Sequence, residues 1–208
     1  MTSTMNYASD IKGVEATNSL VDVMNPYNPK RNTAELQHFL MVCMLVAGKT
    51  AYIQNKKFIA FKAEFNNFGI FDAIYFSGID FAMQMARKHG LGKYTLFEKF
   101  IKEFYILNLD LKSCTAEELE KLPGIGFKSS RFLLINCREN YRCAVLDTWI
   151  LKFLKTKFNN IPSSTPTSKF QYSRIENLYL DYCDNNNLNP RILDLELWKQ
   201  SSRKENKL

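Results

Sequence analysis

Leu122-Pro123-Gly124-Ile125-Gly126 is the stretch that decides the fold, because it separates two segments whose apolar residues recur at helical spacing. Before it, Thr115 and Glu118 form a capping box, which predicts a helix that begins near residue 116. After it, a second predicted helix has an apolar side made of Phe127, Phe132, Leu133 and Ile135. The sequence therefore predicts two helices joined by a tight turn, a helix-hairpin-helix over residues 116–136.

The two glycines of this turn permit backbone conformations and close approaches that a side chain would block. Backbone amides at the start of the second helix would then be free to hold a DNA phosphate, and Gly124, Ile125 and Gly126 are the predicted phosphate-binding residues. Such contacts bind DNA without reading its sequence. Taken alone, the turn is also compatible with an ordinary connection between helices, or with a DNA-binding hairpin that has no catalytic role.

The rest of the chain favours an all-α fold, because alternating strand-like runs are scarce. Helices are expected to begin near Thr33 and near 190, where Asn189 is an N-cap followed by proline at the first helical position. The Phe and Tyr side chains of residues 52–76 could stack on bases, but we expect them to form the core of packed helices. Another helix is predicted over residues 168–184, with Phe170, Ile175, Leu178 and Tyr182 inward.

Two ionisable residues follow the turn. Lys128 lies two residues past Gly126, and Asp147 follows 19 residues later, after the apolar run Ala144-Val145-Leu146 and before a helical stripe. This context predicts that Asp147 is a helix N-cap. A carboxylate can stabilise a positive charge that develops during a reaction. A primary amine can act as a nucleophile and form a Schiff base. Without this context, Lys128 could be a solvated helix side chain and Asp147 simply a cap.

A hairpin, a lysine and an aspartate in this order resemble the helix-hairpin-helix-GPD superfamily of DNA glycosylases, which includes endonuclease III and the 8-oxoguanine glycosylases. The interval from Lys128 to Asp147 is similar to that of the 8-oxoguanine glycosylases. The short archaeal-type members are similar in their C-terminal helices, through Ile175-Glu176-Asn177, Leu193-Asp194-Leu195 and Trp198. The resemblance implies a monomeric DNA glycosylase and AP lyase in base excision repair, with Lys128 as nucleophile, Asp147 as its carboxylate partner and DNA containing 8-oxoguanine as substrate.

The same resemblance implies roles for residues outside the hairpin. Asp194 and Trp198 would contact the base, although Trp198 is equally compatible with a core position. Lys207 corresponds to the lysine that ends the archaeal-type proteins, but here Leu208 follows it. Residues 45–51 resemble the segment that fills the gap left by an extruded base, and Gly48 stands where relatives usually have Asn or Gln. Since glycine has no side chain, we expect Lys49 or another loop to fill the gap.

A target base must leave the duplex to be reached, which requires a cleft beside the catalytic residues. At 208 residues the chain fits one domain or two closely packed lobes. We expect a single glycosylase domain, residues 1–208, with a base-binding cleft between two helical lobes. Lobe A is expected to comprise about residues 1–32 and 158–208, and lobe B about residues 33–157, including the hairpin.

Composition favours a polyanionic partner such as nucleic acid, because Lys and Arg outnumber Asp and Glu by 28 to 21 and the formal charge is +7. The resemblance implies that this partner is double-stranded DNA. The five cysteines are widely spaced and the two histidines isolated, so we expect reduced thiols and neither a metal nor a cofactor. No apolar run approaches the roughly 20 residues of a membrane span, which favours a cytoplasmic, nucleoid-associated protein, or a nuclear one in a eukaryote. The expected DNA track consists of Lys152, Lys155, Lys157, Arg131, Arg138 and Arg142.

Three alternatives remain open at this stage. The same chemistry could remove another damaged or modified base. The chain could be a noncatalytic helix-hairpin-helix module that binds DNA without turnover. It could also be a helical domain for protein interaction, which would have no salt-sensitive affinity for DNA.

Overall fold

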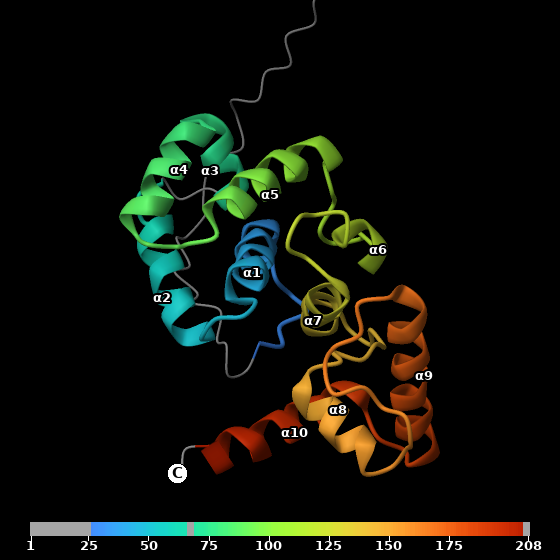
Figure 1. Ribbon diagram of the computed structural model, residues 1–208. Coiled ribbons are helices and arrows are strands. Elements are labelled where there is room, and N and C mark those ends of the chain that lie inside the picture. Colours follow the sequence, from blue (N-terminus) through green and yellow to red (C-terminus); the bar gives the residue numbers. More distant parts are fainter. Residues whose placement is uncertain (1–25, 66–68, 206–208) are drawn as a thin grey trace, which may run out of the picture.

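The computed structural model describes residues 26–65 and 69–205, with side chains as far as residue 200. Within these residues the protein contains ten helices and no strand, which confirms the predicted all-α fold (Figure 1). The helices in chain order are α1 (Thr33–Val46), α2 (Ala51–Lys62), α3 (Ile70–Ser77), α4 (Ile79–Lys88), α5 (Tyr94–Leu107), α6 (Ala116–Leu119), α7 (Phe127–Cys137), α8 (Thr148–Lys155), α9 (Lys169–Asn185) and α10 (Pro190–Glu205).

Several helix starts follow the local capping signals. At α6 the Thr115 side chain accepts a hydrogen bond from the Glu118 amide and the Glu118 carboxylate accepts one from the Thr115 amide, which confirms the capping box. At α10 the Asn189 side chain accepts a hydrogen bond from the Arg191 amide at 3.0 Å, as expected for an N-cap. Short-range sequence signals therefore suffice to place these helices.

Helix α1 is the centre of the larger hydrophobic core. Every residue from Leu36 to Leu45 is buried, and a helix buried on all sides needs neighbours on all sides. Helices α2, α3 and α7 pack directly against it, and α4 and α5 lie beyond it at the top of Figure 1. Phe58, Phe61, Phe65 and Phe71 are buried in this core, as predicted for the aromatic stretch, whereas Tyr52, Tyr75 and Phe76 of the same stretch are exposed.

A second cluster of buried residues joins helices α8, α9 and α10. The predicted inward face of α9 was wrong at Phe170, which is 80% exposed, and Leu178 and Tyr182 are only half-buried. Both the predicted and the observed sets follow helical spacing on one helix, and tertiary packing selects between them. The buried face of α9 consists of Tyr172, Ile175, Tyr179 and Cys183.

The two clusters meet between α7 and α8. Residues 144–154 pack with α9, although the sequence analysis grouped residues as far as 157 with lobe B. The division into lobes as such stays a prediction. At the junction, Arg131 of α7 is 6% exposed and pairs with Glu120 and, at 3.6 Å, with Glu176 of α9. A buried guanidinium needs such partners, and this one links the helices on both sides of the boundary.

The segment before α1 lies against α7. The Asn28 amide donates to the Asn136 carbonyl at 2.9 Å, and the Arg31 guanidinium donates to the same carbonyl at 3.0 Å. These contacts hold the neighbouring Tyr27 near the end of α7.

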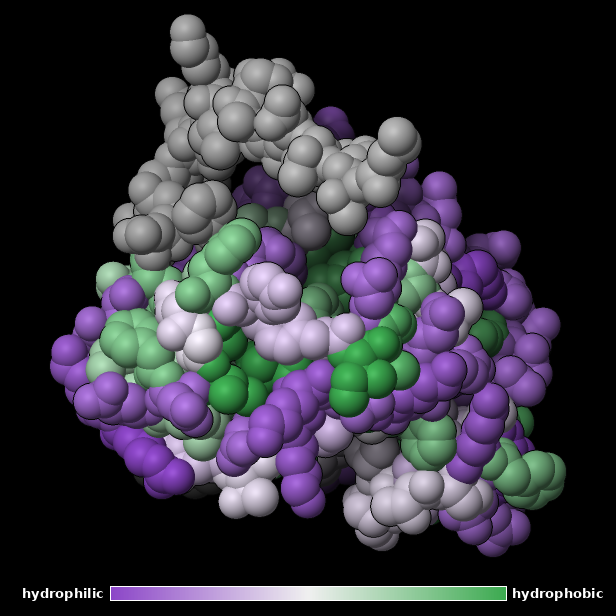
Figure 2. All heavy atoms as spheres, turned by 90° about the horizontal axis from the view of Figure 1, so that it is seen from above, coloured by the Kyte–Doolittle hydropathy of each residue, from purple (hydrophilic) through white to green (hydrophobic). Residues whose placement is uncertain are grey.

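Figure 2, which views the molecule from the side of α3, α4 and α5, shows hydrophobic residues among the hydrophilic ones. No helix in the described part of the chain combines the length and apolar character that a membrane span requires.

Candidate active site

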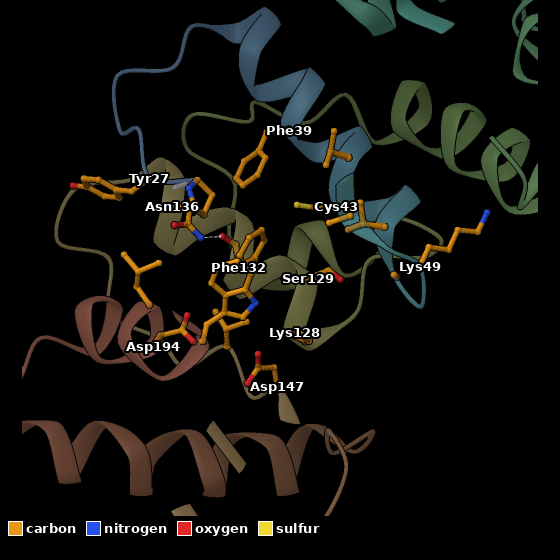
Figure 3. Close-up of a pocket in the computed structure, with 18 of the residues that line it drawn as sticks. Tyr27, Phe39, Cys43, Lys49, Lys128, Ser129, Phe132, Asn136, Asp147 and Asp194 are labelled. Carbon is orange, nitrogen blue, oxygen red and sulfur yellow. Dashed lines mark hydrogen bonds between the residues drawn. The ribbon is translucent and has the colours of Figure 1, made fainter. Parts of the chain in front are cut away.

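A pocket of about 820 Å³ lies between α1, α7 and α10. The loop that follows α1, the segment before α1, and Asp147 complete its lining. Figure 3 shows Lys128, Asp147 and Asp194 on one side of this pocket, with Phe39 and Cys43 across from them. The pocket therefore brings together residues that are up to 172 positions apart in the sequence, from Pro26 to Trp198.

Lys128 is the second residue of α7 and is exposed at the pocket. Helix α7 begins at the tight turn after α6, so the turn determines where this side chain projects. No ion pair or hydrogen bond among the described residues joins the Lys128 ammonium to Asp147 or Asp194, although both carboxyl groups line the same pocket. The amine is therefore available to a ligand.

Asp147 is the N-cap of α8, as predicted. Its Oδ1 accepts hydrogen bonds from the backbone amides of Trp149 at 2.8 Å and Ile150 at 2.9 Å. No other described residue donates to Oδ2, which leaves one carboxylate oxygen for a ligand. Asp147 is half-buried at the N-terminus of α8, where two amide donors face one of its oxygens.

The extended segment that leads to Asp147 is held by Tyr172 of α9. The Tyr172 hydroxyl donates to the Ala144 carbonyl at 2.7 Å and accepts from the Leu146 amide at 3.2 Å. The Thr165 hydroxyl donates to the Leu146 carbonyl at 2.7 Å. Because both sides of the segment are bonded, the backbone that positions the Asp147 carboxylate is fixed by the second core cluster.

Asp194 of α10 is a second carboxyl group in the pocket. Burial and, to a smaller extent, the nearby charge of Asp147 raise the pKa of Asp194 to about 7, whereas Lys128 opposes the shift. Among the described residues, no hydrogen-bond donor reaches this carboxyl group. Asp194 and Asp147 thus differ in environment although they line one cavity.

The turn between α6 and α7 has two glycines with different surroundings. Gly124 has a φ of +89°, and a Cβ built there would lie 3.0 Å from a Leu96 methyl carbon, so the folded chain itself requires glycine at this position. At Gly126 a Cβ would meet nothing within 4 Å, and no side chain caps α7. The space beside the first backbone amides of α7 is consequently open. Ile125, between the two glycines, is buried.

The apolar wall of the pocket comes from α1 and α7. Val42, Cys43 and Val46 of α1 line it, and the rings of Phe39 and Phe132 pack at a centroid distance of 5.7 Å. Trp198 of α10 also lines the pocket and is half-buried, so its side chain is accessible from the cavity.

Tyr27 and Arg191 line the pocket, although no sequence pattern singles them out. Tyr27 lies in the segment before α1, and the guanidinium of Arg191 sits 3.8 Å from the centroid of its ring. The only signal near Arg191 is the Asn189-Pro190 helix start, which places α10 but not the neighbour of its first turn. Contacts between distant segments therefore complete this wall.

The loop after α1 forms part of the rim. Gly48 has a φ of +73° and no atom within 4 Å of a built Cβ, so it contributes no side chain to the cavity. The Lys49 ammonium donates to the Leu91 carbonyl at 3.0 Å, and in Figure 3 this side chain points away from Asp147. Lys207, the remaining predicted base-recognition residue, lies outside the described residues.

The predicted DNA track is wrong at Arg131, and it stays a prediction at Arg138 and Arg142, which are partly exposed and exposed. Arg131 is buried in ion pairs, Arg138 donates to the Cys114 carbonyl at 2.5 Å, and Arg142 pairs with Asp184 at 2.5 Å. Each of these guanidinium groups thus pairs with a carboxylate or donates to a carbonyl of a residue that is distant in the sequence. The lysines are on or just after α8 and are exposed: Lys152, Lys155 and Lys157.

No group of three or more His, Cys, Asp or Glu side chains in the described residues is placed to hold a metal ion, and the five cysteines are free and buried. Fold and site together define an all-α protein with a pocket that contains an amine and two carboxyl groups. No family model matches this chain, and comparisons with curated proteins and with solved structures find no match either.

Proposed function

We propose that this chain is a bifunctional DNA glycosylase and AP lyase that removes a damaged base, foremost 8-oxoguanine, from double-stranded DNA. One observation carries the proposal: Lys128 and Asp147 belong to different elements, 19 residues apart, and line one pocket. Its volume of about 820 Å³ is within the range of about 300–1,000 Å³ usual for small-molecule sites. A flipped nucleotide is a ligand of this size class.

In this proposal Lys128 is the nucleophile. Its neutral amine attacks C1′ of the extruded nucleotide while the bond between C1′ and the base breaks. Asp147, held by two amide hydrogen bonds, stabilises the positive charge that develops on the sugar during this step. The sugar ring then opens: the C1′–O4′ bond breaks, O4′ takes a proton, and the amine on C1′ becomes a Schiff base. The Schiff base makes a proton on C2′ acidic, and its removal expels the 3′ phosphate by β-elimination. Base removal and strand cleavage thus share one amine.

The turn beside Lys128 supplies the proposed DNA grip. The uncapped start of α7 and the open space over Gly126 allow a phosphate to approach backbone amides. The formal charge of +7 and the exposed lysines of α8 add sequence-independent attraction, so affinity should fall steeply with added salt. A single chain contains every group named here, and we propose that it acts as a monomer.

The substrate assignment rests on the resemblance of the hairpin, Lys128, Asp147, Asp194 and Trp198 to 8-oxoguanine glycosylases. The pocket chemistry is equally compatible with another damaged or modified base. A panel of duplexes that carry 8-oxoguanine, oxidised pyrimidines, uracil or hypermodified thymines separates these substrates. Lack of cutting at 8-oxoguanine would reject that base while leaving the lyase chemistry open.

Borohydride trapping tests the chemistry directly. A Schiff base between Lys128 and an abasic duplex is reduced to a stable amine, so the parent should migrate as a covalent protein–DNA complex on a denaturing gel. Lys128→Gln should abolish the complex, because glutamine has no nucleophilic amine. Lys121→Gln is the matched control, since Lys121 is exposed in the adjacent turn but does not line the pocket.

Two outcomes overturn the proposal. Equal trapping of the parent and Lys128→Gln rejects Lys128 as the nucleophile. A parent that binds an abasic duplex in a salt-dependent manner but is never trapped is a noncatalytic DNA-binding module.

A further inference from the structure

We propose that Asp194 is a further catalytic residue, which donates its proton to the departing base and then takes a proton back from the amine of Lys128. This role rests on the proposed glycosylase function and adds a group to it. A base that leaves with the electron pair of its glycosidic bond is a better leaving group when it is protonated as the bond breaks. The structure offers Asp194 as the group that can hold such a proton.

The first argument is position. Asp194 lines the same cavity as Lys128 and Asp147, but it projects from α10, whereas Lys128 begins α7 and Asp147 begins α8. Figure 3 shows the three side chains together on one side of the pocket. A base in the cavity can therefore contact a group other than the carboxylate that faces the sugar.

The second argument is the difference between the two carboxyl groups. Asp147 accepts two amide hydrogen bonds at the N-terminus of α8, where amide donors stabilise a negative charge. Asp194 has no such donor among the described residues, and the charge of Asp147 disfavours a second charge in the same pocket. When two nearby carboxyl groups differ in this way, the proton resides on the less stabilised one.

Other groups around Asp194 do not supply a compensating charge. The buried Tyr179 of α9 and Cys143 before α8 both interact electrostatically with it, and burial raises the pKa of each, so both are neutral near pH 7. Arg191 lines the same pocket, with its guanidinium over the Tyr27 ring. Lys128 lowers the pKa of Asp194, yet this pKa remains raised to about 7. A group with a pKa near the working pH both donates and accepts protons efficiently.

The proton balance closes with these two residues alone. The bond between C1′ and the base nitrogen breaks, and the base receives its electron pair and the Asp194 proton. The Lys128 nitrogen forms a bond to C1′ and becomes a secondary ammonium. This ammonium returns one proton to the Asp194 carboxylate, which leaves a neutral secondary amine on C1′ and a protonated Asp194. The step requires no oxidant, reductant or additional co-reactant.

The test compares two substrates with Asp194→Asn. Excision from a duplex with a damaged base should fall about 100-fold, because general acid catalysis typically contributes about 10²–10⁴-fold. Cleavage of a preformed abasic duplex should stay within about threefold of the parent, because no base departs. Retained trapping on the abasic duplex also shows that the variant is folded. Glu196→Gln, on the exposed side of α10, is the matched control and should leave both activities unchanged.

The pH profile gives a second readout. In the parent, single-turnover excision should decline above about pH 7 as Asp194 loses its proton, and Asp194→Asn should lack this decline. Asp194→Glu, which keeps a carboxyl group, should recover part of the excision activity.

Unchanged excision by Asp194→Asn, or an equal loss on both substrates, overturns the role of Asp194 while parent trapping keeps the lyase proposal intact. A parent that is not trapped on any abasic duplex rejects the proposed function and this role together.

Discussion

The two sides of the pocket differ in chemistry and in the core that supports them. The side formed by α1 is apolar, through Val42, Cys43 and Val46, and belongs to the larger core cluster. The opposite side carries Asp147 and Asp194, and its backbone is held by the second cluster. The charged groups are therefore positioned independently of the wall that would accommodate the base. Substitutions on the two sides should consequently affect different steps.

The largest effect is expected on the charged side, at Asp147→Asn. Asparagine is as good an N-cap as aspartate, so α8 and DNA binding should be kept. The variant loses the negative charge opposite the developing positive sugar, and base excision should fall about 1000-fold, or about 4 kcal/mol in activation free energy. Single-turnover kinetics and a DNA-binding titration measure the two properties separately.

Asp181→Asn is the control for this variant, because Asp181 is exposed on α9 and lies outside the pocket. Normal turnover by Asp147→Asn would remove this carboxylate from the mechanism. Loss of DNA binding together with turnover would show that its main contribution is structural.

The second prediction concerns a buried titratable group behind the apolar side. His38 of α1 is 4% exposed, and burial lowers its pKa to about 4, with Lys62 and Arg31 adding to the shift and Asn55 opposing it. The folded-state pKa is below the ordinary value of 6.5, so the unfolded chain binds a proton first as the pH falls. The stability that His38 contributes is complete above about pH 6.5 and is lost progressively down to about pH 4.

Chemical denaturation of the parent at about pH 7.5 and about pH 4 should reveal this loss, worth about 3 kcal/mol from a shift of about 2.5 pH units. His38→Gln should lack this share of the decline. His89→Gln should retain it, because His89 is partly exposed and contacts Glu64 at 2.7 Å. Parallel pH profiles for the parent and His38→Gln would contradict the prediction.

Features that depend on neighbouring residues could be predicted from the sequence, whereas contacts between distant residues could not. The all-α class and the starts of α6 and α10 depend on residues three positions apart or fewer, as at Thr115 and Glu118, and these predictions are confirmed. The ion pair of Arg131 joins it to Glu176, which is 45 residues away, so no local pattern indicates this pair. For that reason Arg131 was expected on a DNA-binding surface.

The candidate site divides in the same way. Lys128 and Asp147 follow recognisable local features, a turn and a cap, and the structure places both in one pocket. The positions of Tyr27 and Arg191 depend on how separate segments pack, so the sequence carried no signal for them. Gly126 and Lys128 keep their proposed roles as predictions that the trapping and binding experiments test.

The smallest effect is expected on the apolar side, at Val46→Phe. Val46 is the last residue of α1, is half-buried and lines the pocket, so a larger ring can extend into the cavity without disrupting the core. Excision should fall about tenfold in kcat/KM, mainly through KM, because small changes in an apolar pocket are worth about 1–3 kcal/mol. Cleavage of a preformed abasic duplex should be unchanged, since no base occupies the pocket.

Asp194→Asn should also slow base excision without slowing cleavage of the abasic duplex, but it should lower kcat rather than raise KM and should change the pH profile. These differences distinguish the loss of a proton donor from a smaller pocket. Ile53→Phe serves as the control for Val46→Phe, because Ile53 is 54% exposed on α2 and does not line the pocket. If Val46→Phe slows cleavage of the abasic duplex as much as base excision, the apolar wall supports the catalytic groups rather than the base, and the two sides of the pocket are not independent.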